Sequence, residues 1–236
     1  AQQEVISPDN AREVARQLLD AEAKLRSEPD AALALLGEVQ EKISSWPADL
    51  AGRLAGDYQT LCFDQGNIAA CGVLQELSPE TTIAFGESKM GEILKDNKGA
   101  PWYFLAKQGQ SVTIALNAVG DSFDPVLNLD GPGGRVTLVY DDDGGDGYNS
   151  LISDQILPVD GMYRIRPEAL SGSGAYRLTL TGQDLPRLAP DTPIPASSAS
   201  GDRWLFEGNA GQIVALELEL GVSDSYASLS MTSVDN

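Results

Sequence analysis

The sequence predicts an α+β multidomain protein, in which N-terminal α-helical hairpins or a small bundle precede an antiparallel jelly-roll-like β-sandwich and a partial second β-sandwich. Two observations lead to this fold class. Apolar residues recur at helical spacing up to residue 79 and alternate with polar residues from about residue 80 onward. A set of motifs also recurs at a constant offset of 102 residues, which indicates an internal repeat.

Residues 1–79 are predicted to form an α-helical domain of about four short helices joined in hairpins. Proline is favoured at the first position of a helix, because its fixed φ suits the helix and an N–H there would have no intrahelical partner. Prolines stand at three such starts: Pro8, Pro29 and Pro47. The segment from Leu54 to Pro79 resembles a tetratricopeptide-type helix pair, and a plain helical bundle is the alternative.

The two cysteines, Cys62 and Cys71, lie almost symmetrically about the turn at Gln65–Asn67. Symmetric positions of an antiparallel helical hairpin face each other, so this spacing favours a disulfide. The alternative is a pair of buried thiols. The spacing is not that of a zinc knuckle or of a thioredoxin-type pair.

Residues 80–183 are predicted to form the first sandwich, because short alternating segments are separated by turns rich in Gly, Asp and Pro. We expect the apolar residues of each segment to share one face. They are Trp102 and Phe104; Val112, Ile114 and Leu116; Leu127 and Leu129; Val136, Leu138 and Tyr140; Tyr163 and Ile165; and Tyr176, Leu178 and Leu180.

Residues 184–200 are rich in Pro and Ser and are predicted to be a linker, and residues 201–236 then repeat the start of the sandwich. The matched pairs are Trp102 with Trp204, Phe104 with Phe206, Gly109 with Gly211, Gln110 with Gln212, Val112 with Val214, Ile114 with Leu216, Leu116 with Leu218, Leu127 with Leu229 and Leu129 with Met231. This β unit is incomplete, since Asn236 corresponds to Gly134. We expect a chain that continues further, packing onto the first sandwich, or assembly with another chain, in that order.

Composition excludes several kinds of function. The formal net charge is −19, which argues against binding nucleic acid or an anionic membrane surface. The sequence contains no histidine, so it cannot build a Ser-His-Asp unit or a His-ligated metal site. No apolar run is long enough to predict a membrane span. The first residue, Ala1, is typical of a chain whose secretory signal has been removed, which predicts a secreted or periplasmic protein.

The stretch "DDDGGDGYNS", from Asp141 to Ser150, is dense in carboxylates and has two interpretations. It can be a tight turn, in which aspartates accept backbone N–H bonds and glycines supply positive φ. It can also be a calcium site, although its spacing does not follow an EF-hand. The candidate calcium ligands are then Asp141, Asp143, Asp146, Asp121, Asp124 and Asp130.

Five motifs in order resemble the bacterial pre-peptidase C-terminal domain family. They are "WYFLAKQGQSVTIAL", "DPVLNLDGPGG", "YDDDGGDGYNSLI", "LPVDGMYRI" and "GAYRLTL". The resemblance covers about residues 82–183, with the first third of a second copy at 195–236, and it does not include the helices. It implies a β-sandwich that is an accessory domain of exported proteins, without catalysis, and that binds matrix proteins or polysaccharide, in some relatives with calcium.

These observations favour a non-catalytic secreted or periplasmic binding or scaffolding protein, with a protein or polysaccharide partner. The competing interpretation is an accessory region of a secreted hydrolase or peptidase whose catalytic domain lies outside this chain. A third possibility is an oligomer that forms through the incomplete C-terminal sandwich.

Overall fold

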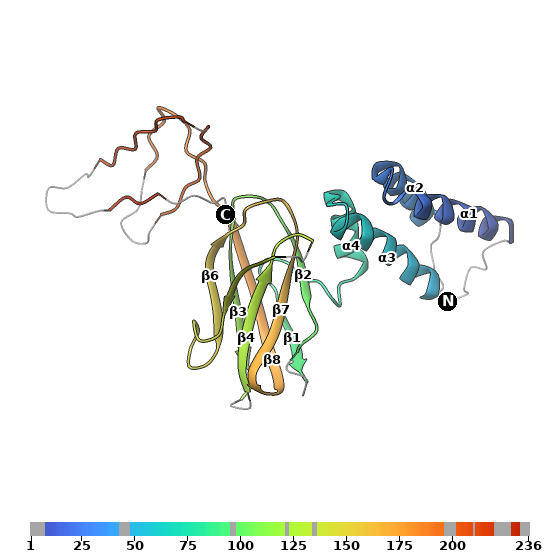
Figure 1. The fold of residues 1–236 in the computed structure, drawn as a ribbon, viewed down its shortest axis with the longest axis horizontal. Helices are drawn as coiled ribbons and strands as arrows, with labels where there is room; N and C mark the ends of the chain where they lie inside the picture. Colours follow the sequence, from blue (N-terminus) through green and yellow to red (C-terminus); the bar gives the residue numbers. More distant parts are fainter. Residues whose placement is uncertain are drawn as a thin grey trace.

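A computed structural model describes residues 8–42, 48–94, 98–120, 123–133, 136–195, 202–209, 211–219 and 228–231. Four helices lie to one side of a β-sandwich, and the chain beyond residue 202 lies to the other side (Figure 1). The predicted order of helices followed by an antiparallel sandwich is confirmed. No helix in these ranges has the length and hydropathy needed to cross a membrane.

The helical part consists of two helical hairpins. Helices α1 (Pro8–Lys24) and α2 (Pro29–Glu41) form the first, and α3 (Ala48–Phe63) and α4 (Ile68–Leu77) form the second. Their apolar faces meet in a common core, whose fully buried members include Leu18, Leu36, Leu54, Tyr58 and Leu61. The two proline starts at the first and second helices are confirmed, and Pro47 lies outside the described residues. The likeness to tetratricopeptide pairs stays a prediction.

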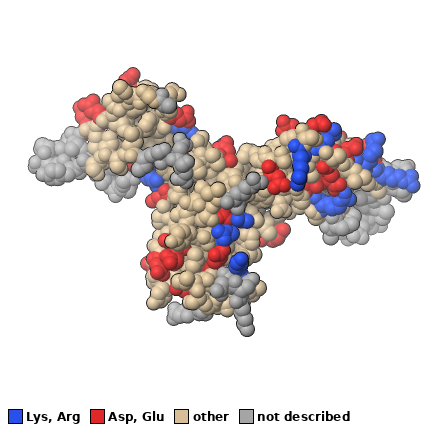
Figure 2. Space-filling view, viewed as in Figure 1, with Lys and Arg blue, Asp and Glu red and all other residues tan. Residues whose placement is uncertain are grey.

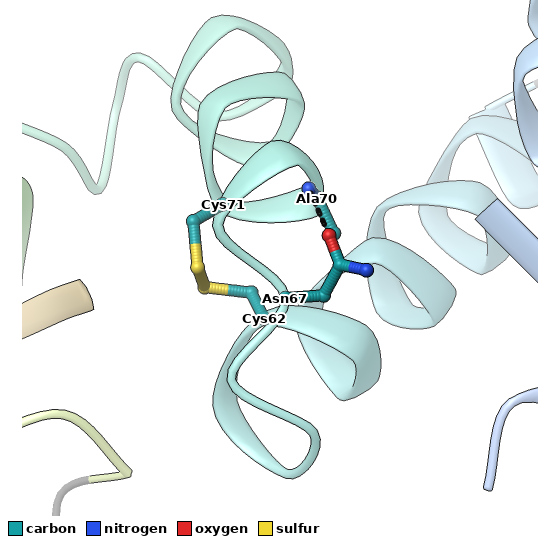
Figure 3. The surroundings of a disulfide bond; sticks show 4 residues. All are labelled: Cys62, Asn67, Ala70 and Cys71. Carbon is teal, nitrogen blue, oxygen red and sulfur yellow. Dashed lines mark hydrogen bonds between the residues drawn. A yellow bond between two sulfur atoms is a disulfide. The ribbon is translucent and has the colours of Figure 1, made fainter. Parts of the chain in front are cut away.

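A disulfide joins the two hairpin arms of α3 and α4, as the sequence predicts (Figure 3). The Cα atoms of Cys62 and Cys71 are 4.7 Å apart, and both side chains are buried. The turn between the helices is fixed by Asn67, whose side-chain oxygen accepts a hydrogen bond from the Ala70 N–H at 3.0 Å. The second hairpin is therefore held by a covalent link and by a helix cap.

One ionisable group in the helical core lacks a partner. Asp57 of α3 is 8% exposed, and its Oδ2 atom has no hydrogen bond within the described structure. Burial, followed by the nearby charge of Glu22, raises the pKa of Asp57 from 3.8 to about 6, although Arg53 opposes this rise. The ionised form of this carboxyl therefore costs the fold stability.

The sandwich has two antiparallel sheets of four strands. One sheet has the order β1-β8-β3-β6, and the other has the order β2-β7-β4-β5. The strands are β1 (Ser88–Ile93), β2 (Trp102–Ala106), β3 (Gln110–Ala118), β4 (Phe123–Asp130), β5 (Thr137–Asp141), β6 (Ser150–Ile156), β7 (Gly161–Gly172) and β8 (Gly174–Asp184). Consequently β7 and β8, the last two strands in sequence, each have a partner on both sides.

Most alternating residues face the core as predicted. Trp102 is buried, and its indole N–H donates to the Tyr176 hydroxyl at 3.0 Å. Phe104 is 1% exposed, and its ring stacks on that of Tyr163 at 5.5 Å. Burial of these aromatic rings between the sheets is the main apolar contribution to sandwich stability.

Strand β5 departs from the prediction. Val136 and Tyr140 were expected on the core face, but their exposed fractions are 64% and 67%. The register of β5 against β4 shifts between Leu129 and Asp130, which marks a bulge near Leu138. Because one extra residue inverts the alternation, Val139 rather than Tyr140 packs toward the core.

The helices are attached to the outer face of the β2-β7 pair. Met162 of β7 is 2% exposed and belongs to the helical core rather than to the sandwich core. The rings of Phe63 and Tyr103 lie 5.0 Å apart across the same contact. The connecting segment also pairs with β2, since the Tyr103 N–H donates to the Thr81 carbonyl and the Ile83 N–H donates to the Tyr103 carbonyl.

The predicted second β unit differs from the first sandwich. Its described residues, at 202–209, 211–219 and 228–231, contain an isolated bridge at Leu205 and no strand. Leu205 exchanges hydrogen bonds with the Pro186–Leu188 segment that follows β8. Residues further along, such as Ile213 at 96% exposure, remain open to solvent.

Replacement of both cysteines by alanine is expected to lower the free energy of unfolding by about 2–3 kcal/mol, because the link closes a short loop in the unfolded chain. Thermal unfolding followed by helical circular dichroism measures this effect. A reducing agent is expected to lower the melting temperature of the parent protein and to leave the double variant unchanged. Equal melting of the parent and the variant would contradict a stabilising disulfide.

Asp57→Asn is expected to raise the free energy of unfolding at neutral pH by about 2 kcal/mol, since it removes a buried charge. The folded pKa of about 6 lies above the reference value of 3.8, so the parent binds its proton more tightly when folded. The parent is therefore expected to lose stability as the pH rises through this window. Urea unfolding of both proteins across this pH range tests it, and parallel pH profiles would rule the effect out.

Candidate binding surface at the acidic loop

The acidic loop, residues 141–150, joins β5 to β6 and is built as a tight turn. The Asp141 Oδ2 atom accepts hydrogen bonds from the Gly144 N–H at 2.8 Å and from the Leu151 N–H at 2.7 Å. This carboxylate closes the loop on itself, because it satisfies backbone donors at both ends. The turn interpretation therefore accounts for the first aspartate.

Asn149 and Ser150 fasten the loop to neighbouring strands. The Asn149 side chain donates to the Asp146 carbonyl at 2.8 Å and accepts from the Ala118 N–H at 2.9 Å, at the end of β3. The buried Ser150 hydroxyl donates to the Pro125 carbonyl of β4 at 2.8 Å. The loop is thus held against both sheets, and its backbone is a fixed platform.

Two glycines are required by close backbone packing. A Cβ atom on Gly144 would lie 2.5 Å from Asp141 Oδ1, and one on Gly145 would lie 2.7 Å from the Asn149 carbonyl oxygen. Both separations are shorter than real Cβ contacts. The Gly-Gly pair is therefore explained by the turn and does not need a ligand.

The remaining carboxylates of the loop point away from these bonds. Asp142, Asp143 and Asp146 have no hydrogen bond or ion pair with any residue that the structure describes. Asp124 of β4 lies beside them. The pKa of Asp124 is raised by burial and then by the charges of Asp143 and Asp142. The loop and its neighbour therefore form a region of negative potential.

Two exposed tyrosines flank the acidic loop. Tyr148 within it is 72% exposed, and Tyr140 at its entrance is 67% exposed. The bulge of β5 is what turns Tyr140 outward, so the expected core position did not point to it. The large exposed rings in this part of the sequence, beside a strand edge, were the available signal. Figure 2 shows acidic side chains gathered on the flank of the sandwich that faces away from the helices.

The six candidate calcium ligands are not brought to one point. Asp121 lies outside the described residues, and Asp141 is bound by backbone N–H groups. Within the ranges that the structure describes, there is no group of three or more acidic, Cys or His side chains arranged to hold a metal ion. Calcium binding stays a prediction, and Asp124, Asp143 and Asp146 are its remaining candidates.

Asp130 has a different role from the one expected. It is 1% exposed, and its carboxylate accepts hydrogen bonds from Arg164 Nε and Arg166 Nε at 2.8 Å each and from the Thr137 hydroxyl at 2.7 Å. Two guanidinium groups neutralise this carboxylate, so it is not a metal ligand. The signal was the alternation of Arg164 and Arg166 in "YRIRP", which places both on one face of a strand.

The electrostatics of Asp130 follow from these bonds. Desolvation is the largest single influence and raises its pKa. Hydrogen bonds from Arg166, Thr137 and Arg164 together outweigh it, and the pKa is lowered below 3.8. The cluster joins β4, β5 and β7, and it closes the outer face of this sheet near the helices.

Comparison with solved structures returns sandwich domains of similar length to residues 82–184. The pre-peptidase C-terminal domain of a collagenase from Bacillus anthracis is 13% identical, with 43% of this chain and 93% of that chain covered and a TM-score of 0.37. PliG from Aeromonas hydrophila, a periplasmic inhibitor of g-type lysozyme, is 16% identical, with 44% and 95% covered and a TM-score of 0.32. The first belongs to the family that the sequence motifs resemble. No family model and no curated protein matches the sequence.

Asp130→Asn is expected to lower the free energy of unfolding by about 3 kcal/mol at neutral pH, because it leaves two arginines without their buried counter-charge. The folded pKa lies below 3.8, so the stability that this group contributes is complete above that pH and is lost as the pH falls through the folded value. Denaturant unfolding of parent and variant at several pH values measures the difference. A difference that persists unchanged into strong acid would contradict an ionic origin.

Proposed function

We propose that this chain is a non-catalytic binding module that holds a basic protein partner against its acidic loop. The observation that carries this proposal is a set of three carboxylates without partners among the described residues, mounted on a fixed turn between two exposed tyrosines. Carboxylates attract and orient a cationic surface, and tyrosines supply contact area at low entropic cost. The net charge of −19 extends the attraction to longer range.

The described surface offers little for catalysis. Its two best hollows have volumes of about 220 Å³ and 190 Å³, and each is lined by one carboxylate, Asp154 in the first and Asp160 in the second. Paired general acid and base groups need two carboxyls in one site. The sequence also has no histidine to serve as a general base.

Export of the protein is supported by the disulfide. Cys62 and Cys71 are joined in the native fold, and such bonds persist in oxidising compartments. We therefore propose a secreted or periplasmic location. In this setting the helices, attached to the sandwich at Met162, provide a second surface for scaffolding.

A displayed library of random peptides and an array of polysaccharides test the proposal with defined probes. Peptides rich in Lys, Arg and aromatic residues are expected to be enriched by the parent protein. A loop variant, Asp142→Asn with Asp143→Asn and Asp146→Asn, is expected to bind them at least about tenfold more weakly.

The matched control is a helix variant, Asp20→Asn with Glu41→Gln and Asp64→Asn, which removes the same charge from exposed helical positions. It is expected to bind like the parent. Equal weakening of both variants would show that net charge alone attracts the peptides. Binding of polysaccharide without peptide enrichment would replace the protein partner with a glycan.

The same proteins separate a calcium site from a protein site. A calcium ion held by these carboxylates would raise the melting temperature of the parent at about 1 mM calcium and not that of the loop variant. Specific observations keep this possibility open: the Asp124 Oδ1 atom is buried without a hydrogen-bond partner among the described residues, and the charges of Asp142 and Asp143 lie close to it.

A further inference from the structure

The segment after the linker is equivalent to a defined part of the folded sandwich. We call residues 202–231 the repeat segment. At the offset of 102 residues, its sequence corresponds to β2, β3 and most of β4, in that order. The three strands that it encodes can therefore be assigned neighbours from the topology of the first copy.

None of these three strands pairs with another in the first sandwich. Strand β2 pairs with β7, β3 pairs with β8 and β6, and β4 pairs with β7 and β5. Every hydrogen-bonded neighbour therefore comes from β5–β8. A segment that contains only the equivalents of β2, β3 and β4 has no lateral partners within itself.

The described residues of the repeat segment behave as this topology requires. Positions that are fully buried in the first copy are exposed in the second, although their apolar character is kept. Val112, Ile114, Leu116, Leu127 and Leu129 are 0% exposed, while their equivalents Val214, Leu216, Leu218, Leu229 and Met231 are 40%, 40%, 40%, 50% and 65% exposed.

The first sandwich cannot supply the missing partners. Its β7 lies between β2 and β4, and its β8 lies between β1 and β3, so both are fully paired. Only the edge strands β1, β2, β5 and β6 are open on one side. A second copy of this chain offers the same edges and the same occupied strands, so it could complete the repeat segment only by opening its own sandwich.

The start of the repeat segment is nevertheless fixed to the first sandwich. Arg203 donates to the Asp154 carbonyl at 2.8 Å, and Leu205 bonds to the chain after β8. Leu205 also sits where a Cβ on Gly109 would lie, 2.4 Å from its Cδ1 atom. These contacts hold one end of the segment while its apolar strand positions project away (Figure 1).

We propose that the repeat segment is an acceptor for a polypeptide that supplies strands equivalent to β5–β8, and that the two together form a second sandwich. The two essential strands of this partner are long and antiparallel, since β7 and β8 have 12 and 11 residues. They alternate apolar and polar residues, because one inserts between the β2 and β4 equivalents and the other lies beside the β3 equivalent. Main-chain pairing would supply affinity, and burial of the alternate side chains would supply specificity.

The test extends the full chain with a copy of its own residues 135–184 after Asn236. In this extended protein, we expect new β-sheet circular dichroism and resistance of the repeat segment to limited proteolysis. The matched control carries the same added residues in scrambled order and is expected to be cleaved within the repeat segment like the parent. Equal cleavage of the two extended proteins would overturn the proposal.

Two further measurements cover the remaining outcomes. In a second variant, residues 204–236 replace residues 102–134 within the first sandwich, and a cooperatively unfolding sandwich is expected. If neither this variant nor the extended protein folds, the segment is not an equivalent of the first third and the proposal fails. Light scattering of the parent is expected to show no oligomer with a protected repeat segment, and such an oligomer would make a second copy the partner instead.

Discussion

Lateral strand pairing to β7 is the interaction on which the rest of this structure depends. Strand β7 lies between β2 and β4, so it joins strands that are far apart in sequence. Its outward side chains do two further things: Met162 enters the helical core, and Arg164 and Arg166 neutralise Asp130. Sheet order, helix attachment and closure of the outer face thus follow from one strand. The cost of burying the Asp130 charge is offset because both arginines reach it from the same face.

The acidic loop is placed by the same architecture. Asp141 and Asn149 satisfy backbone groups at the ends of β5, β6 and β3, which makes the loop rigid. Once these bonds are made, Asp142, Asp143 and Asp146 have no structural task among the described residues. Like charges gathered near Asp124 raise its pKa and oppose folding locally. A cationic partner or ion would relieve this repulsion, so the structure and the proposed binding role point the same way.

Local patterns in the sequence predicted the features that are local in the fold. The helices, the disulfide and the inward faces of β2, β3 and β8 follow from periodicity and spacing, because these depend on near neighbours. The outward Tyr140 was missed because a bulge in the pairing of β5 with β4 inverts the alternation. The role of Asp130 was missed because its arginines lie 34 and 36 residues away and meet it only through strand register. The repeat segment shows the same limit, since it keeps the strand pattern and lacks the partners.

These points reduce to one claim: an alternating segment of this fold becomes an ordered strand only when its lateral partners are present. Native-state hydrogen exchange at equivalent positions of the two copies tests it within a single sample. The amides of Ile114 and Leu116, which lie between β8 and β6, are expected to exchange at the slow rate set by global unfolding. Those of Leu216 and Leu218 are expected to exchange within about tenfold of an unstructured peptide. Comparable protection of the two pairs would contradict the claim.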